Sequence, residues 1–470
     1  MRLVMLYFLL TVFVPTQQIP RFEPAECPPN TTNVECGFLV VPLNRFDADE
    51  TTEIRVALVR YAGSSTDSAL VFLNGGPGAP ILDVTAHSTL WSDLSHEIGR
   101  DVIVLDMRGV GRSDPALNCP QLTAEIYIAA QLTPVAGAAA YEEALRACRA
   151  ALRDAGVGYT TAEASEDVND LRDVFGYEQL DVWGNSYGSR VALELLRTHP
   201  DAVRALVLDS IVPPTFNMQA YLIEQQSAAM THIFAAYADQ CANCADLESV
   251  FYDTVERLNA DPAILPDGSL IDGTGFAAQI LDLSYQSFLL PRIPELILAA
   301  AEGDFNDFAQ LVLPMLSYNA STMAWGLRYS VLCASEYPYS TDEWIDSQLE
   351  RLHPAVREGF RAVTERERHI CADWDMPPAP VAERDPVQSR VPVLLISGEF
   401  DPVTPPAFAD QVAAGLPNSV SVIIPAQGHG PATGSPCGLP LIAAFLTHPP
   451  ALLDLTCVES VPPLRFTMPS

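Results

Sequence analysis

The chain has 470 residues, 49% of them hydrophobic, so it can bury a core large enough for two or three domains, or for one domain with a large insertion. Acidic residues outnumber basic ones by 59 to 26, a formal net charge of −33, which argues against a nucleic-acid partner because phosphates would be repelled. The sequence contains no lysine, which excludes Schiff-base chemistry, pyridoxal phosphate anchoring, P-loop phosphate binding and Ser-Lys dyads.

The first predicted element is a secretory signal peptide at residues 1–18. Met1 and Arg2 precede an apolar run that is shorter than the ~20 residues a membrane span needs. The cleavage site is poorly marked near Pro15 to Gln18, so an uncleaved anchor remains an alternative. We expect a secreted, extracytoplasmic protein with no stable membrane span after signal cleavage.

The sequence has ten cysteines, an even number that fits disulfides in an oxidising compartment. In Cys241-Ala-Asn-Cys244, a redox motif or half a zinc site are the alternatives to a disulfide. The first would need a preceding thioredoxin-type strand and the second another ligand pair, and neither is evident. Sequence proximity predicts the pairs Cys27–Cys36, Cys119–Cys148, Cys241–Cys244, Cys333–Cys371 and Cys437–Cys457.

After the signal peptide, a proline-rich segment leads to two alternating apolar runs at residues 37–42 and 53–60. A turn-rich stretch at 44–52 separates the two runs. This arrangement predicts an antiparallel hairpin at the edge of a sheet.

From this hairpin onward, the chain alternates strands and helices. The predicted strands are apolar almost throughout, as parallel strands covered on both faces should be. The pattern predicts a doubly wound, mostly parallel α/β sheet. Strands are expected at 69–73, 101–105, 179–183, 205–208, 391–396 and 419–424, with helices such as 141–152, 164–175 and 407–414 between them.

Residues 213–385 break this alternation, because strand signals fade and Ala/Leu-rich windows with helical spacing replace them. A proline-rich stretch near 377–380 marks the end of the segment. We interpret it as a helical cap inserted between a first core part, 19–212, and a second, 386–470, which carries a C-terminal disulfide. Cap helices are expected at 220–237, 247–258, 276–283, 292–301 and 341–352.

The strongest chemical signal is a G-x-S-x-G pentapeptide at 184–188, centred on Ser186. A predicted buried strand runs into it, and a segment with helical spacing follows directly. This context favours a nucleophile elbow, a tight strand-to-helix turn that exposes a serine. The alternative is a chance Gly/Ser turn.

A serine hydroxyl needs a base to take its proton, and that base needs an acid to fix its tautomer. His429 follows the predicted strand at 419–424, and Asp401 follows the one at 391–396, with Glu399 as the alternative acid. The Asp-Pro step at 401 could instead only cap a helix. The chain order Ser186, Asp401, His429 is that of the α/β-hydrolase triad, and all three follow strands at one edge of the sheet.

An oxyanion hole requires two backbone N–H groups. One is expected from Tyr187, the residue after the nucleophile, and the other from Gly76 in the Gly-rich loop after the strand at 69–73. A phosphate-binding loop is excluded by the missing lysine and the wrong glycine spacing. The loop at 106–114 is expected to brace the site.

Together these motifs resemble the proline iminopeptidase and tripeptidyl aminopeptidase family of α/β-hydrolase serine peptidases. The resemblance covers about Cys36 to Cys457, and the cysteines of the cap and C-terminus resemble the secreted tripeptidyl aminopeptidase branch. Asn74 is a departure, since iminopeptidases usually carry His there. The matching segments are 74–78, 106–113, 184–188, 398–405 and 428–430.

The resemblance implies an exopeptidase that releases tripeptides or N-terminal residues, such as proline, from peptides with a free N-terminus. A buried cap carboxylate would hold the free ammonium, and our hypothesis is Glu336, beside Cys333. A solvated helix-end acid is the alternative. An esterase or lipase on the same fold and a noncatalytic binding module are the alternative functions. No cofactor or metal is expected.

Overall fold

The computed structural model of the chain describes residues 19–468, apart from 28–33, 48, 50, 86–87, 121, 123–133, 153–154, 156, 242 and 450–452. The predicted signal peptide therefore lies outside the described residues. Across the described part of the chain, no helix combines the length and the apolar character that a bilayer span requires.

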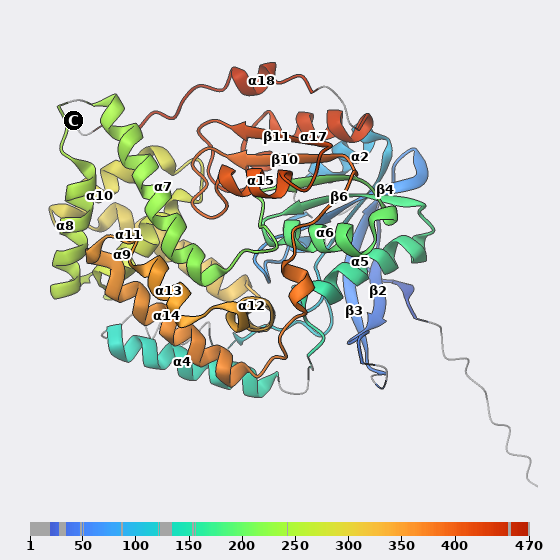
Figure 1. Ribbon diagram of the computed structural model, residues 1–470, viewed down its shortest axis with the longest axis horizontal. Coiled ribbons are helices and arrows are strands. Elements are labelled where there is room, and N and C mark those ends of the chain that lie inside the picture. Colours follow the sequence, from blue (N-terminus) through green and yellow to red (C-terminus); the bar gives the residue numbers. More distant parts are fainter. Residues whose placement is uncertain are drawn as a thin grey trace, which may run out of the picture.

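Nine strands of the described chain form one central sheet (Figure 1). The first three strands and their junction with β5 are antiparallel, and every later pairing is parallel. In sheet order the strands are β1 (Arg21–Pro24), β2 (Val34–Pro42), β3 (Glu53–Tyr61), β5 (Arg100–Leu105), β4 (Ser65–Leu73), β6 (Gln179–Asn185), β7 (Val203–Asp209), β10 (Val393–Gly398) and β11 (Ser419–Ile424). The predicted hairpin is β2–β3, and β1 from the proline-rich segment forms the edge beyond it.

Helices cover both faces of the sheet, as predicted for a doubly wound fold. On one face, buried residues of α5 (Thr161–Phe175), α6 (Tyr187–Thr198) and α15 (Pro406–Ala413) share a core with the sheet. On the other, α2 (Leu90–Ile98) and α17 (Gly438–Thr447) pack around Trp183. Short helical turns lie in the loops between these elements, namely α1 (Leu82–Thr85), η2 (Pro200–Ala202), α16 (Pro431–Gly434) and α18 (Thr456–Glu459).

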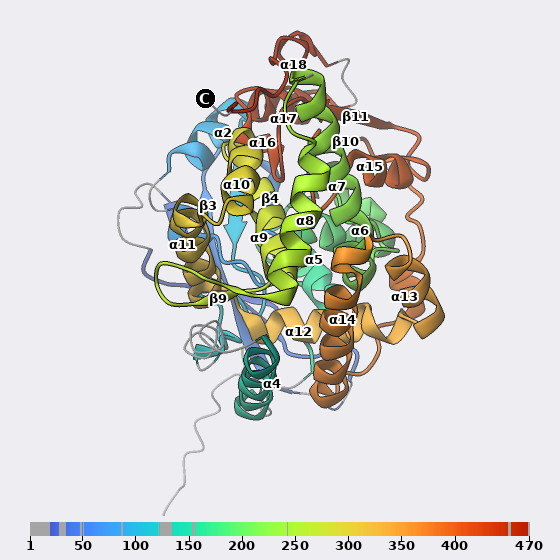
Figure 2. The ribbon, with the colours of Figure 1, turned by 90° about the vertical axis from the view of Figure 1, so that its left-hand side faces the viewer.

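The chain between β7 and β10 is mostly helical and has a hydrophobic core of its own, including Phe251, Phe276 and Phe308. These helices are grouped to one side of the sheet in Figure 1 and lie in front of it in Figure 2. The segment contains α7 (Met218–Gln240), α8 (Leu247–Ala260), a small ladder of β8 (Ala263–Ile264) and β9 (Leu270–Ile271), α9 (Gly273–Ser284), η3 (Leu290–Arg292), α10 (Ile293–Ala301), α11 (Asn306–Thr322), α12 (Trp325–Ser335), η4 (Tyr337–Tyr339), α13 (Asp342–Leu349), α14 (Pro354–Trp374) and η5 (Val381–Arg384).

Two parts of the chain outside the insertion also pack against it. The helix α4 (Pro134–Ala151), which precedes the elbow in sequence, lies along α14 (Figure 1). At the other end, Phe466 is buried in the core of the inserted helices, and the N–H of Thr467 donates to the carbonyl of Pro291 at 2.8 Å. The C-terminal segment therefore ties the insertion to the sheet domain.

The structure places the ten cysteines in the five pairs expected from sequence proximity. Cys333 of α12 is bonded to Cys371 of α14, and Cys119 to Cys148 of α4. Two pairs of segments are therefore cross-linked within one hydrophobic cluster, and Cys333 lies three residues before Glu336, the residue expected to bind an ammonium group.

Candidate active site

Ser186 occupies the turn between β6 and α6. Its backbone has φ 53° and ψ −123°, a conformation that a non-glycine residue adopts only where the surroundings enforce it. The surroundings do so here, because the N–H of Ser186 donates to the carbonyl of Asp209 on β7 at 2.9 Å and its own carbonyl accepts from the hydroxyl of Ser189 at 2.5 Å. The predicted strand–Ser–helix arrangement is therefore present.

His429 and Asp401 lie together after two neighbouring strands of the same sheet edge. His429 Nδ1 is 3.0 Å from Asp401 Oδ1 and 2.9 Å from Oδ2, and both side chains are buried. His429 Nε2, the other ring nitrogen, is buried and has no hydrogen-bond partner within the part of the chain that the structure describes. The ring therefore has one nitrogen fixed by a carboxylate and one left for a reacting group.

Asp401 is held by several donors besides the histidine. The N–H groups of Val403 and Thr404 donate to Oδ1 at 2.8 Å, and the hydroxyls of Ser210 and Thr404 donate to Oδ2 at 2.9 and 2.8 Å. Burial alone would raise the pKa of Asp401, but His429 and these donors hold that pKa below its ordinary value. The carboxylate is therefore ionised when it faces the imidazole.

Glu399, the alternative acid, lies elsewhere. Its Oε2 accepts from the N–H of Ala426 at 2.8 Å, and so it braces the loop that leads to His429.

The Gly-rich loop after β4 lies directly against the serine. A Cβ added to Gly75 would come within 2.7 Å of the Cβ of Ser186, so only glycine fits at this position. The next residue, Gly76, lines the same cavity, and Tyr187 provides the first N–H group of α6, which has no partner inside the helix. Both expected oxyanion donors therefore border the serine.

The loop after β5 braces this arrangement, as expected. Asp106 accepts from the N–H groups of Ile81, Leu82 and Arg112 at 2.7, 3.1 and 2.9 Å, and so anchors the chain that follows the Gly-rich loop. Burial raises the pKa of Asp106 and these backbone donors lower it, with burial prevailing.

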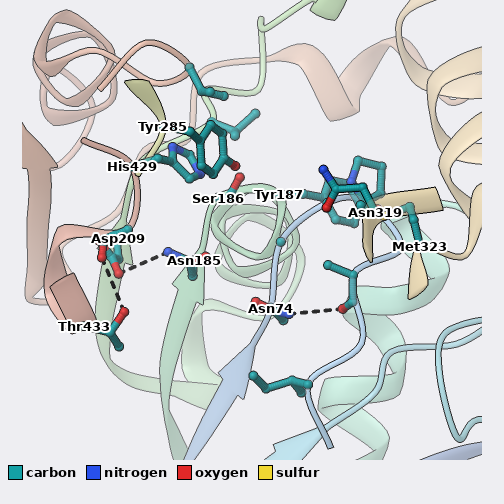
Figure 3. Close-up of a pocket in the computed structure, with 18 of the residues that line it drawn as sticks. Asn74, Asn185, Ser186, Tyr187, Asp209, Tyr285, Asn319, Met323, His429 and Thr433 are labelled. Atoms are coloured by element: carbon teal, nitrogen blue, oxygen red, sulfur yellow. Dashed lines mark hydrogen bonds between the residues drawn. The ribbon is translucent and has the colours of Figure 1, made fainter. Parts of the chain in front are cut away.

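A cavity of about 810 Å³ surrounds Ser186, between the sheet edge and the inserted helices. The cavity extends from Ser186 in two directions (Figure 3). On one side lie Asn319 and Met323 of the insertion, and on the other lie Asn185, Asp209 and Thr433. We refer to these as the cap arm and the inner arm.

Tyr285, which was not predicted, connects the insertion to the site. Its ring lies 4.2 Å from the ring of His429, its carbonyl accepts from the N–H of His429 at 3.0 Å, and its hydroxyl lies beside Ser186 (Figure 3). Burial raises the pKa of Tyr285 and interaction with Ser186 lowers it, so the phenol stays protonated at neutral pH. The end of α9 therefore forms the roof over the histidine.

Glu336 lies at the C-terminal end of α12, is buried, and lines the cavity as expected. Its Oε1 is 3.0 Å from a guanidinium nitrogen of Arg190, which is on α6, one turn after the nucleophile. This carboxylate is therefore already paired with a cation of the protein, which sequence spacing could not reveal.

These features define the class of protein: it is a serine hydrolase of the α/β-hydrolase fold. The family described as alpha/beta hydrolase fold matches residues 68–259, and the family described as TAP-like protein matches residues 357–457. The resemblance seen in the sequence motifs is therefore confirmed.

Curated relatives agree with this class. A tripeptidyl aminopeptidase of Streptomyces coelicolor is 25% identical over 79% of this chain and 73% of its own length. The serine protease Hip1 of Mycobacterium tuberculosis is 23% identical, covering 88% of this chain and 86% of its own length. A protein of the same species named carboxylesterase B is 25% identical over 79% of this chain and 76% of its own length.

Proposed function

We propose that the chain is a secreted serine exopeptidase that releases tripeptides or single N-terminal residues, such as proline, from peptides through an acyl-enzyme. The observation that carries the proposal is the buried Asp401–His429 pair beside Ser186, in a cavity roofed by inserted helices. The similarity to proteins named tripeptidyl aminopeptidase and serine protease supports a peptide substrate. The five disulfides support an oxidising compartment.

In the proposed acylation step, Ser186 Oγ attacks the carbonyl carbon of the scissile bond. His429 Nε2 takes the hydroxyl proton and passes it to the leaving nitrogen, so that the C–N bond breaks and an ester with Ser186 forms. Asp401 keeps Nδ1 protonated and stabilises the imidazolium that forms between the two transfers. Water then attacks the ester carbon and gives a proton to the same nitrogen. The bond to Ser186 Oγ breaks, Nε2 returns the proton to this oxygen, and the acyl product leaves as a carboxylic acid.

The negative charge that develops on the carbonyl oxygen is assigned to the N–H groups of Gly76 and Tyr187. The donor from Tyr187 is at the N-terminus of α6, where the helix dipole also favours an anion. Gly76 is held from the cap side, because a guanidinium nitrogen of Arg328 donates to its carbonyl at 3.0 Å. The inserted helices therefore help to fix the loop that stabilises the transition state.

The proposal is tested by comparing hydrolysis of tripeptidyl and prolyl p-nitroanilides with that of p-nitrophenyl acyl esters, in the wild type and in Ser186→Ala. We expect the wild type to cleave an anilide with a free N-terminus. We expect Ser186→Ala to lose at least about 10³-fold in kcat and to lose labelling by a fluorophosphonate, because the nucleophile is gone.

An esterase is the second candidate, favoured by the relative named carboxylesterase B. If the enzyme cleaved esters in a Ser186-dependent way and cleaved no anilide measurably, that result would establish the esterase and reject the peptidase. Labelling that persists in Ser186→Ala would reject the proposed nucleophile itself.

Glu336 remains our proposal for the group that binds the substrate's ammonium. We expect Glu336→Gln to reduce about tenfold the preference for free over N-acetylated peptides, measured as a ratio of kcat/KM values, because a charge-assisted hydrogen bond is lost. Glu336→Gln also removes the ion-pair partner of Arg190, which can destabilise the enzyme. That effect acts equally on the free and the N-acetylated peptide, so it cancels in the ratio.

Glu383→Gln is the matched control for this experiment. Glu383 is also a buried glutamate that interacts with Arg190, but it does not line the cavity. We expect it to leave the ratio unchanged, and an unchanged ratio in Glu336→Gln as well would contradict the role of Glu336.

A further inference from the structure

The inner arm of the cavity contains a buried acid that the catalytic proposal does not use. Asp209 is the last residue of β7, in register with Asn185 of β6, and its side chain is 1% exposed. It follows the same pattern as Asp401, a carboxylate at the carboxyl end of a parallel strand. Its backbone carbonyl supports the elbow, while its side chain faces the cavity.

The hydrogen bonds of this side chain do not account for its charge. Asp209 Oδ2 accepts from the amide nitrogen of Asn185 at 3.1 Å, and Oδ1 accepts from the N–H of Ala432 at 3.4 Å. Both donors are neutral, and each contacts a different oxygen, so the two hydrogen bonds use both oxygens but supply no positive charge. The negative charge of a carboxylate at this position is therefore not balanced by these contacts.

No arginine of the described chain forms an ion pair with Asp209, whereas two other acids that line the cavity interact with arginines. Glu336 is paired with Arg190, and the carboxylate of Asp282 interacts with Arg328. The charged groups that act on Asp209 are His429, which favours its ionised form, and Asp401, which opposes it. Burying a carboxylate without a cation is costly, and this burial raises the pKa of Asp209 to about 7.

We propose that Asp209, with Asn185 beside it, forms a subsite for a primary ammonium group in the inner arm. A bound ammonium would supply the missing counter-charge and donate hydrogen bonds to a side chain that can only accept them. The proposal rests on the proposed peptidase function, because peptide substrates and products carry such groups.

Peptide hydrolysis offers two sources of this ammonium group. One is the α-ammonium of the substrate, which would then bind here and not at Glu336. The other is the new amino terminus of the departing peptide, which forms next to His429. The chemistry of recognition is the same for both. The experiment below distinguishes them.

Recognition of this kind depends on pH in a defined direction. Because the pKa of Asp209 is raised to about 7, the carboxyl group is mostly neutral below that pH and charged above it. The advantage of a substrate with a free amine should therefore shrink as the pH falls through about 7.

The experiment compares the wild type, Asp209→Asn and Asp253→Asn. Asparagine at 209 removes the charge and keeps one acceptor oxygen for Ala432, and its NH₂ group can donate to Asn185 once that amide turns over. Asp253 on α8 is an exposed acid that serves as a matched control. In the first assay, kcat/KM is measured for free and N-acetylated tripeptidyl aminomethylcoumarins at pH values on either side of 7. In the second, p-nitrophenyl acetate forms the acetyl-enzyme, and Ala-Ala-amide competes with methanol for the acetyl group.

Two ratios are compared: kcat/KM for the free over the N-acetylated coumarin, and acetyl transfer to Ala-Ala-amide over transfer to methanol. We expect Asp209→Asn to lower one or both ratios by about tenfold to a hundredfold, and to make the lowered ratio independent of pH. A loss in the first assay identifies the substrate's ammonium, and a loss in the second identifies the departing amine. If both ratios match those of the wild type and Asp253→Asn, the subsite does not exist.

Failure of the peptidase proposal would look different. The coumarin substrates would then not be cleaved by any variant, while Ser186-dependent hydrolysis of p-nitrophenyl acetate would continue. The acceptor assay would still decide whether Asp209 binds an amine on the leaving-group side, because it needs only the acetyl-enzyme.

Discussion

Asp401→Asn is expected to lower kcat by about 10⁴-fold for any substrate of the enzyme. The asparagine NH₂ group would replace either Oδ1, which accepts from the N–H groups of Val403 and Thr404, or Oδ2, which accepts from two hydroxyls. His429 Nδ1 lies 3.0 and 2.9 Å from the two positions, so in either orientation the NH₂ group faces the N–H of the imidazole. The imidazole would then lose the carboxylate that fixes its tautomer and stabilises its protonated form. The measurement is kcat on p-nitrophenyl acetate, with thermal unfolding to show that the variant is folded.

Glu399→Gln is the natural control, since it makes the same chemical change two residues away. Among the residues that the structure describes, the hydrogen bond of Glu399 is with the backbone N–H of Ala426 at 2.8 Å, and a glutamine carbonyl oxygen can keep that bond. Activity within a few-fold of the wild type is expected. A collapse of kcat in Glu399→Gln with little change in Asp401→Asn would reverse the assignment of the acid.

The sheet could be predicted because its inner parallel strands are largely apolar on both faces and the α/β order is regular. Residues such as Leu70 and Val71 are both fully buried although they point to opposite faces, so the strand reads as a continuous apolar run. The helix α14 was missed for the opposite reason. It is rich in arginine and glutamate, and only a narrow stripe that includes Phe360 and Trp374 is buried.

The predicted site residues share one local signal, a polar residue just after a buried strand. That rule placed Ser186, Asp401 and His429 together, and it would also have selected Asp209 after β7. No comparable rule could find Tyr285, because it follows a cap helix and reaches His429 only through the packing of the insertion on the sheet. The pairing of charged side chains around the cavity also could not be predicted, because it depends on contacts between distant segments. Glu336, for example, is paired with Arg190.

Gly188→Ala is expected to prevent formation of a stable, active enzyme. A Cβ on Gly188 would lie 2.1 Å from the carbonyl oxygen of Leu73 and 2.8 Å from that of Asn74, and both are backbone atoms that cannot turn away. The helix α6 and the end of β4 must then separate. The cost should exceed the ~1–3 kcal/mol typical of overpacking and consume much of the ~5–15 kcal/mol that stabilises a folded protein. Soluble yield, thermal unfolding and fluorophosphonate labelling measure the effect.

Gly275→Ala provides the matched comparison, because it is also a helical glycine, in the first turn of α9, with a nearest contact of 3.2 Å to a side-chain oxygen of Asp272. It should unfold within a few degrees of the wild type and label at the same rate, since alanine favours a helix. If Gly188→Ala behaved in the same way, the elbow and the Gly-rich loop would not be in contact. A third outcome is loss of labelling in Gly188→Ala with a nearly normal unfolding temperature. It would show that the sheet stays folded while the added methyl group moves the Gly75–Gly76 loop away from Ser186. This loop would move because it follows directly from Leu73 and Asn74.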